Sequence, residues 1–177
     1  MNFLRIFAAG LLLMLTACDS DQVVMPPPPP LELTSDAAGF YCSMTVIEHP
    51  GPKAQIFVAD AAAPLWFPSV RDMFAYTMLP EENQDIRAIY VSDTGATDDY
   101  ANVAEGAWLE AQNALYVLGS EIDGGMGLPE AIPFADHDQA AAFAREYGGE
   151  VVSFDDVSPD FVFAEIEADP AADGGKI

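Results

Sequence analysis

The sequence predicts an α+β fold made of two small ββαβ-like units, each a hairpin, a helix and a closing strand. Three observations support this prediction. Short β-prone runs at 54–58 and 114–118 each lead, after a loop and an aromatic segment, into a helical pattern. Each helical pattern has a start signal, and each is followed by another β-prone run. Because both halves, about 36–93 and 103–157, share this order, we interpret them as an internal duplication. The alternative is a coincidental similarity of two α+β segments.

In the first half, the run 54–58 is the first strand of the predicted hairpin. Ser69 is a residue type that commonly caps a helix, and a helical pattern follows it to about residue 79. The run 88–92 is the predicted closing strand. The acidic stretch 93–99 that follows is expected to be a solvated linker.

In the second half, the run 114–118 opens the predicted hairpin. Asp136 followed three residues later by Gln139 has the spacing of a capping box. Four apolar residues at positions i, i+3, i+4 and i+7 give the predicted helix one apolar face: Ala140, Phe143, Ala144 and Tyr147. Gly148-Gly149 ends this helix, and the run 150–154 is the predicted closing strand.

The first residues predict an export signal. Residues 1–17 begin with a positive charge and contain an apolar run that is too short to span a bilayer. The signal ends in Leu15-Thr16-Ala17-Cys18, which resembles a bacterial lipobox and implies cleavage before Cys18 and lipidation of that residue. Multiple acyl chains would anchor the protein stably, whereas the alternative, a plain cleavable signal, would release it. Asp19 suggests retention at the inner membrane.

The segments that flank the domain have biased compositions. Within the lipidated linker, 18–35, five consecutive prolines (26–30) predict an extended polyproline II spacer that rises about 3.1 Å per residue. The domain proper is expected over 36–164. The acidic, Ala- and Gly-rich segment 165–177 is predicted to be a disordered tail.

Charge excludes several classes of partner. The chain of 177 residues has 29 acidic and only 6 basic side chains, and its formal net charge is −23. Nucleic-acid binding and a polybasic grip on anionic lipid are therefore excluded, because both need a basic surface. Cations and basic protein surfaces remain possible partners.

Cys42 and Met44 are the first candidate metal ligands. If Cys18 is lipidated, Cys42 is the only free thiol of an exported chain, where an unpaired thiol is a liability unless it is buried or used. In an extended segment Cys42 and Met44 would project from the same face. Thiolate and thioether are soft ligands that favour Cu(I). The alternative is that both residues are core filler.

Two further candidates lie in turn-forming segments. Met126 stands among three glycines in Gly124-Gly125-Met126-Gly127, a segment whose backbone can turn sharply and present a thioether. Its alternative is a turn whose Met plugs the core. His49 precedes Pro50-Gly51-Pro52, a turn signal.

These segments together resemble the NosL family of accessory lipoproteins for nitrous-oxide reductase maturation. The resemblance rests on the following segments: Cys42-Ser43-Met44, His49–Gln55, Gly119–Phe134, Ala140–Phe143, Gly148-Gly149 and Phe154-Asp155, together with the lipobox. It implies a duplicated, treble-clef-like fold similar to part of organomercurial lyase. It also implies a periplasm-facing, membrane-anchored Cu(I) chaperone rather than an enzyme, with nitrous-oxide reductase and its membrane assembly complex as partners.

The resemblance also ranks the ligands. Cys42 and Met44 match the family's Cys-x-Met motif, and Met126 matches its Gly-Gly-Met-Gly loop. His49 ranks fourth, because many relatives have other residues before Pro-Gly-Pro. Ser43 stands where the family often has glycine.

The sequence is also compatible with two other functions. One is a structural lipoprotein in which Cys42 is buried. The other is an enzyme that uses Cys42 as a nucleophile and His49 as its base.

Overall fold

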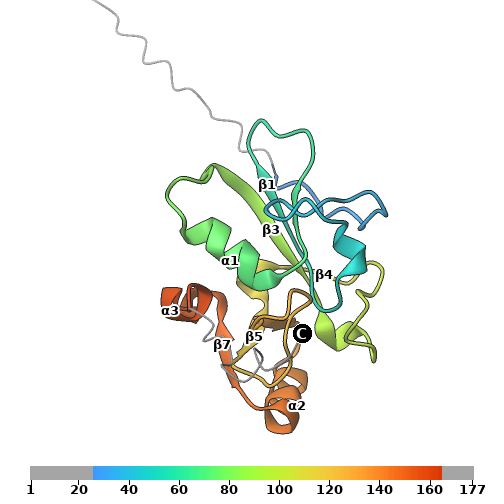
Figure 1. Ribbon diagram of the computed structural model, residues 1–177, viewed down its shortest axis with the longest axis vertical. Coiled ribbons are helices and arrows are strands. Elements are labelled where there is room, and N and C mark those ends of the chain that lie inside the picture. Colours follow the sequence, from blue (N-terminus) through green and yellow to red (C-terminus); the bar gives the residue numbers. More distant parts are fainter. Residues whose placement is uncertain (1–25, 165–177) are drawn as a thin grey trace, which may run out of the picture.

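The computed structural model describes residues 26–164, which form two antiparallel sheets and their flanking helices (Figure 1). The predicted signal peptide, the lipidation of Cys18, Asp19 and the acidic tail lie outside these residues. Among the residues described, no helix has the length and apolar character that a bilayer crossing requires.

The first unit contains a four-stranded sheet and one helix. Its elements are β1 (Ala54–Val58), β2 (Leu65–Phe67), α1 (Val70–Met78), β3 (Ile86–Ser92) and β4 (Trp108–Glu110). The strand order is β2-β1-β3-β4, with every neighbouring pair antiparallel. The predicted hairpin, helix and closing strand are confirmed, whereas the edge strand β4 was not predicted.

The second unit repeats this plan with three strands. Its elements are β5 (Leu115–Leu118), β6 (Ile132–Phe134), α2 (His137–Tyr147) and β7 (Glu150–Ser153), in the order β6-β5-β7. A short helix, α3 (Pro159–Val162), follows. In both units the first strand lies between the second strand and the closing strand, so the predicted ββαβ order is confirmed for each. A common origin of the two units stays a prediction.

Both main helices begin at the predicted caps. The Ser69 hydroxyl accepts a hydrogen bond from the Asp72 amide at 3.4 Å, and the Asp136 carboxylate accepts from the amides of Asp138 and Gln139 at 2.9 and 3.0 Å. The capping-box prediction is only half right, because the Gln139 side chain donates to Gly95 O at 3.1 Å instead of returning to the cap.

The acidic linker is less free than predicted. It contains a 3-10 turn, η2 (Thr94–Ala96), which begins at Asp93. The Asp93 carboxylate accepts from the Gly95 amide at 2.9 Å and from the Ala135 amide, in the second unit, at 3.1 Å. The Asp93 carboxylate therefore caps the turn and also connects the linker to the residues between β6 and α2.

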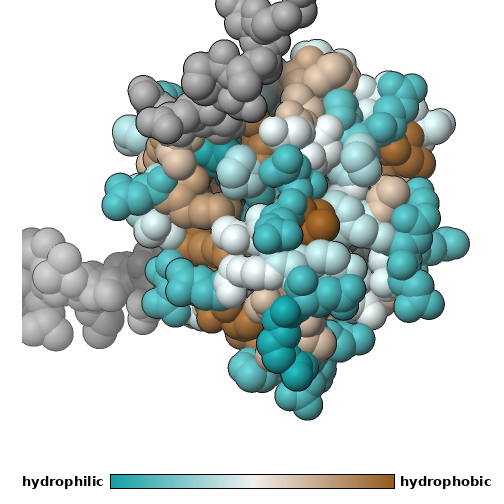
Figure 2. All heavy atoms as spheres, turned by 60° about the horizontal axis from the view of Figure 1, so that its bottom comes forward, coloured by the Kyte–Doolittle hydropathy of each residue, from teal (hydrophilic) through white to brown (hydrophobic). Residues whose placement is uncertain are grey.

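The main core is shared by both units. Buried apolar residues of helix α1 belong to the same core cluster as residues of β1 and β3 in its own unit and of β5 in the other. The Phe74 ring lies 5.0 Å from the Tyr116 ring and 4.9 Å from the Phe154 ring. On β5, Tyr116 faces this core, whereas Val117 joins a smaller core against α2. Around these cores, the face drawn in Figure 2 is mainly hydrophilic with separate apolar patches.

The predicted proline spacer is partly attached to the domain. Pro28 O accepts from the Tyr90 hydroxyl at 2.8 Å. The backbone amide and carbonyl of Leu31 both bond to the buried side-chain amide of Gln55, each at 2.9 Å. We call residues 28–32 the strap. Contacts with the domain thus begin before the expected boundary at residue 36.

Candidate metal centre

Cys42 lies in a tight turn, so the expectation of an extended Cys42–Met44 segment is wrong. The Ser43 amide donates to Gly39 O and the Gly39 amide donates to Met44 O, both at 2.8 Å. Ser43 has a φ of 57°, in the left-handed region. We call residues 39–44 the Cys42 turn. The turn breaks the two-residue alternation that would have placed both sulfur atoms on one face.

The Cys42 thiol is half-buried against the backbone of its own turn. A Cβ atom at Gly39 would lie 2.6 Å from the Cys42 Sγ and 3.1 Å from Pro68 Cδ. Because Gly39 has no side chain, it leaves space for the thiol beside the residues that connect β2 to α1. Cys42 is free and is not one of the buried core residues, which disfavours the purely structural alternative.

Exposed apolar side chains surround this thiol along the chain. Met44 is 43% exposed, and Phe40, Tyr41 and Ile47 are exposed as well. Isolated exposed apolar residues are ordinary, but four within eight positions around a half-buried thiol form an unusually apolar rim. Met44 is thus accessible to a soft metal ion, and it is not core filler.

Aromatic contacts anchor the Cys42 turn on the first unit. The Phe40 ring lies 5.4 Å from the Tyr76 ring of α1 and 5.9 Å from the Phe67 ring of β2. The Tyr41 hydroxyl donates to the Glu82 carboxylate at 2.9 Å. Burial and this bond raise the pKa of Tyr41, so its hydroxyl remains a donor at neutral pH.

Met126 lies half-buried at the tip of a narrow loop. The loop is closed by bonds from the Gly124 amide to Leu128 O at 2.8 Å and from the Gly127 amide to Gly124 O at 2.9 Å. We call residues 123–129 the Met126 loop. Gly125 fits because a Cβ there would collide with Pro50 O and would lie 2.9 Å from His49 Cβ. Close approach to the His49–Pro50 backbone therefore requires this glycine.

His49 connects the two candidate segments. It follows a 3-10 turn, η1 (Val46–Glu48), that leads from the Cys42 turn, and its Nδ1 lies 3.3 Å from Gly125 O in the Met126 loop. Because a carbonyl oxygen only accepts, this contact places the proton on Nδ1 and leaves Nε2 as the free lone pair. That is the tautomer commonly found for a metal-ligating His. The same contact directs Nδ1 to the loop instead of the Cys42 thiol.

The residue types that most often bind metal ions do not form a cluster anywhere in residues 26–164. No group of three or more His, Cys, Asp and Glu side chains there is placed to hold a metal ion. The four predicted donors lie on two segments that touch at His49 and Gly125. A metal centre built from them would depend on the thioethers of Met44 and Met126, which suits a soft ion.

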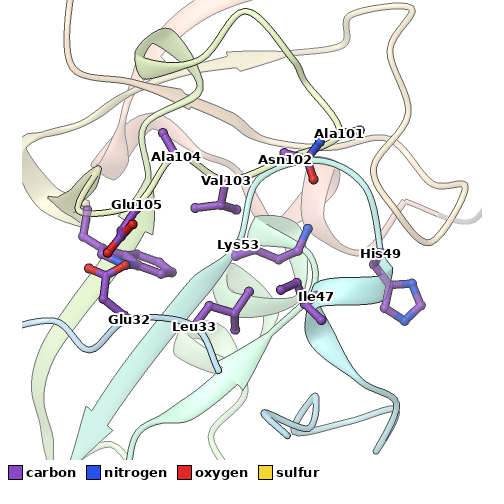
Figure 3. A pocket seen from close by; sticks show the side chains of 11 residues that line it. Glu32, Leu33, Ile47, His49, Lys53, Ala101, Asn102, Val103, Ala104 and Glu105 are labelled. Carbon is purple, nitrogen blue, oxygen red and sulfur yellow. The ribbon is translucent and has the colours of Figure 1, made fainter. Parts of the chain in front are cut away.

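Lys53 is a buried cation beside His49 that sequence reasoning did not single out. It is 2% exposed, and its ammonium donates to Pro50 O and Gly51 O. Burial lowers the pKa of Lys53 to about 8. In Figure 3 it lies in a pocket of about 300 Å³, whereas the His49 ring points away from the other labelled side chains. Lys53 therefore holds the turn that positions His49.

Comparisons with known proteins find relatives for most of this chain. The model of the NosL family matches residues 30–162. The chain is 42% identical over 171 residues to the copper-binding lipoprotein NosL of Achromobacter cycloclastes, covering 95% of this chain and 88% of the relative. It is 29% identical over 163 residues to the protein of the same name from Stutzerimonas stutzeri, covering 89% and 84%.

A solved structure has the same fold. The crystal structure of the copper chaperone NosL from Shewanella denitrificans superposes with a TM-score of 0.71 at 28% identity, covering 76% of this chain and 98% of that chain. The family model and the relative at 42% identity each extend over most of the sequence. The chain therefore belongs to the NosL family.

Proposed function

We propose that this protein is a copper chaperone that carries Cu(I) on Cys42, Met44 and Met126, with His49 as a further ligand. The observation that carries the proposal is the half-exposed, unpaired Cys42 next to the exposed Met44, on a segment that touches the Met126 loop. The names of the relatives, copper-binding lipoprotein and copper chaperone, support the same role.

The chemistry of this donor set suits transport rather than catalysis. A Cys42 thiolate provides one strong bond to Cu(I), and the thioethers donate without adding charge. Such a site binds a soft ion without enclosing it, so the ion can leave by stepwise ligand exchange. The exposed Met44 is the natural first ligand to be exchanged. No bond needs to be made or broken in a substrate, and we propose no enzymatic turnover.

The destination of the copper belongs to the same proposal. We infer that Cys18 carries the lipid anchor, that the domain faces the periplasm, and that Asp19 favours the inner membrane. The copper would pass to nitrous-oxide reductase or to the membrane complex that assembles it. The family assignment and the lipoprotein names of the relatives support this inference.

The first test is an anaerobic Cu(I) titration of residues 19–177, which include every described residue, against a chromogenic chelator. We expect about one Cu(I) per chain. Cys42→Ser should abolish competition with the chelator, because the only thiolate is lost. Met44→Leu and Met126→Leu should each weaken binding while preserving side-chain volume.

Met78→Leu is the matched control. Met78 is a partly buried methionine near the end of α1, and its substitution should leave Cu(I) affinity unchanged. Binding that survives Cys42→Ser, or an equal loss in Met78→Leu and Met126→Leu, would contradict the proposed site.

A further inference from the structure

Glu130 is the one acidic residue that is buried within residues 26–164. It lies two residues before β6 and is 2% exposed. Its Oε1 accepts hydrogen bonds from the Arg71 amide at 2.8 Å and from the Ala131 amide at 2.9 Å. Arg71 is the second residue of α1, so the carboxylate lies at the N-terminus of that helix, where its dipole favours negative charge.

The second oxygen of Glu130 has a different neighbour. Oε2 is buried and has no hydrogen-bond partner. A Cβ at Gly124 would lie 2.5 Å from it, so the backbone of the Met126 loop packs closely against this oxygen. Gly124 is required there because any side chain would collide with the carboxylate. One oxygen is thus fixed by α1, and the other supports the base of the Met126 loop.

The Cys42 turn is supported by the chain that leads into the same helix. The Phe40 amide donates to Trp66 O in β2 at 2.8 Å, and Gly39 lies against Pro68, which precedes the cap of α1. Glu130 therefore lies between two structures: the N-terminus of α1, near which the Cys42 turn is held, and the Met126 loop. The described contacts of the loop place it between Glu130 on one side and His49–Pro50 on the other.

Helix capping alone does not account for a buried acid here. Ser69 already caps α1, and an uncharged side chain could accept the same two amide bonds. Burial raises the pKa of Glu130 to about 7, which is a sign that the charged form is costly at this position. A side chain that keeps one oxygen unpaired at such a cost fits a role in positioning its neighbours.

We propose that Glu130 is a positioning residue that sets the place of the Met126 loop relative to the Cys42 turn, so that the Met126 thioether reaches a metal held by Cys42. This inference rests on the proposed function. Glu130 does not touch the metal. It acts through Gly124, much as outer-shell groups orient the ligands of other metal sites.

The test is a double-mutant cycle on Cu(I) affinity, measured by chelator competition with wild type, Glu130→Ala, Met126→Leu and the double variant. Glu130→Ala should weaken binding by about tenfold, the lower end for loss of an outer-shell partner. In the Met126→Leu background the same change should have no further effect, because the thioether that it positions is already absent. Glu130→Gln, which keeps the shape and one acceptor, should restore most of the affinity.

Two companion variants separate positioning from general destabilisation. Ile89→Ala, in the core strand β3, lowers stability without touching either segment, and it should leave Cu(I) affinity unchanged in the folded protein. Gly124→Ala displaces the loop while keeping the carboxylate, and it should show the same dependence on Met126. Gly124→Ala therefore replaces Glu130→Ala if the latter does not fold.

The failures of the two proposals are distinguishable. Additive effects of Glu130→Ala and Met126→Leu, or unchanged affinity in Glu130→Ala, would overturn the role of Glu130 and leave the chaperone intact. Equal Cu(I) affinities of the wild type and Met126→Leu would also overturn the role of Glu130. Absence of Cu(I) binding in the wild type, or binding that is indifferent to Cys42→Ser, would instead refute the proposed function.

Discussion

At the scale of single residues, the position of the Cys42 thiol depends on two neighbours that act through their backbone. Gly39 leaves the space that the sulfur occupies, and Ser43 adopts a φ of 57°, which glycine would adopt with less strain. Ser43 can adopt it because the closing bonds between Gly39, Ser43 and Met44 hold the turn. The geometry of the thiol is thus a property of the whole turn.

We expect Gly39→Ala to reduce both stability and Cu(I) affinity. The new methyl group would lie 2.6 Å from the Cys42 Sγ and 3.1 Å from Pro68 Cδ, so the turn must move. Overpacking of this kind costs about 1–3 kcal/mol. Urea denaturation and chelator competition measure the two effects.

The control for this prediction is the Cys42→Ala background. Without the sulfur atom, Gly39→Ala retains only its contact with Pro68 and should cost much less stability. Equal costs with and without the thiol would show that Gly39 does not make room for Cys42.

Glu130 and Lys53 make opposite contributions to stability as pH changes. Burial raises the pKa of Glu130 from 4.5 to about 7, so between these values the folded protein binds more protons than the unfolded chain, and stability falls as pH rises. Burial lowers the pKa of Lys53 from 10.5 to about 8, so the unfolded chain binds more protons between those values, and stability rises with pH. Urea denaturation midpoints should therefore fall between about pH 4.5 and 7 and rise between about pH 8 and 10.5.

Matched substitutions assign each part of that profile. Glu130→Gln should remove the decline between about pH 4.5 and 7, and Lys53→Met should remove the rise between about pH 8 and 10.5. Other groups near Glu130, which are Asp72, Lys53 and Tyr100, remain in Glu130→Gln, so their contributions persist in the comparison. A decline of unchanged size in Glu130→Gln would contradict the assignment.

At the scale of elements, local signals in the sequence predicted the regular structure well and the site geometry poorly. Hydrophobic periodicity and caps located both main helices and their flanking strands, because these depend on neighbouring residues. The three-residue strand β4 has too little pattern to be detected, and it exists because β3 offers an open edge.

The donor segments show what local signals omit. Ser43 is left-handed because of the closing bonds of its own turn, which no motif announces, and the approach of Gly125 to Pro50 joins segments far apart in the sequence. Glu130 did give a signal, a single acid between apolar residues and prolines, but only the structure shows what it supports. The candidate residues could be chosen from motifs, whereas their arrangement depends on long-range packing.

The strap is the element whose attachment can be tested directly. The buried Gln55 amide makes both of its bonds to the backbone of Leu31, so Gln55→Leu should keep the packing but release these bonds. We expect proteases to cleave within the strap several times faster, while the free energy of unfolding of the domain, measured by urea denaturation, changes by about 1 kcal/mol. Tyr90→Phe, which removes only the bond to Pro28 O, should have a smaller effect. Unchanged cleavage in both variants would indicate that the strap is held by other contacts.

At the scale of the whole molecule, the two units are alike in strand order but not independent. Helix α1 belongs to the first unit by sequence, yet Phe74 contacts Tyr116 of β5 and Phe154 after β7. Asp93 adds a polar connection by accepting from the Ala135 amide. The larger core is built from both units, so neither half alone contains it, and only the smaller core against α2 lies within one unit.

We therefore expect the protein to unfold in one cooperative transition, and Phe74→Ala to destabilise both units equally. Removing this fully buried ring should cost about 3–5 kcal/mol. Trp66 and Trp108, whose rings are 5.8 Å apart, report on the first unit by fluorescence, and amide hydrogen exchange in β5 reports on the second. The two probes should show the same loss of stability, since a shared core couples the two units.

Phe163→Ala, at an exposed position, should change stability by less than about 0.5 kcal/mol. A β5 that keeps its protection in Phe74→Ala would mean that the units fold separately, and the contact between His49 and the Met126 loop would then have to hold without a common core behind it.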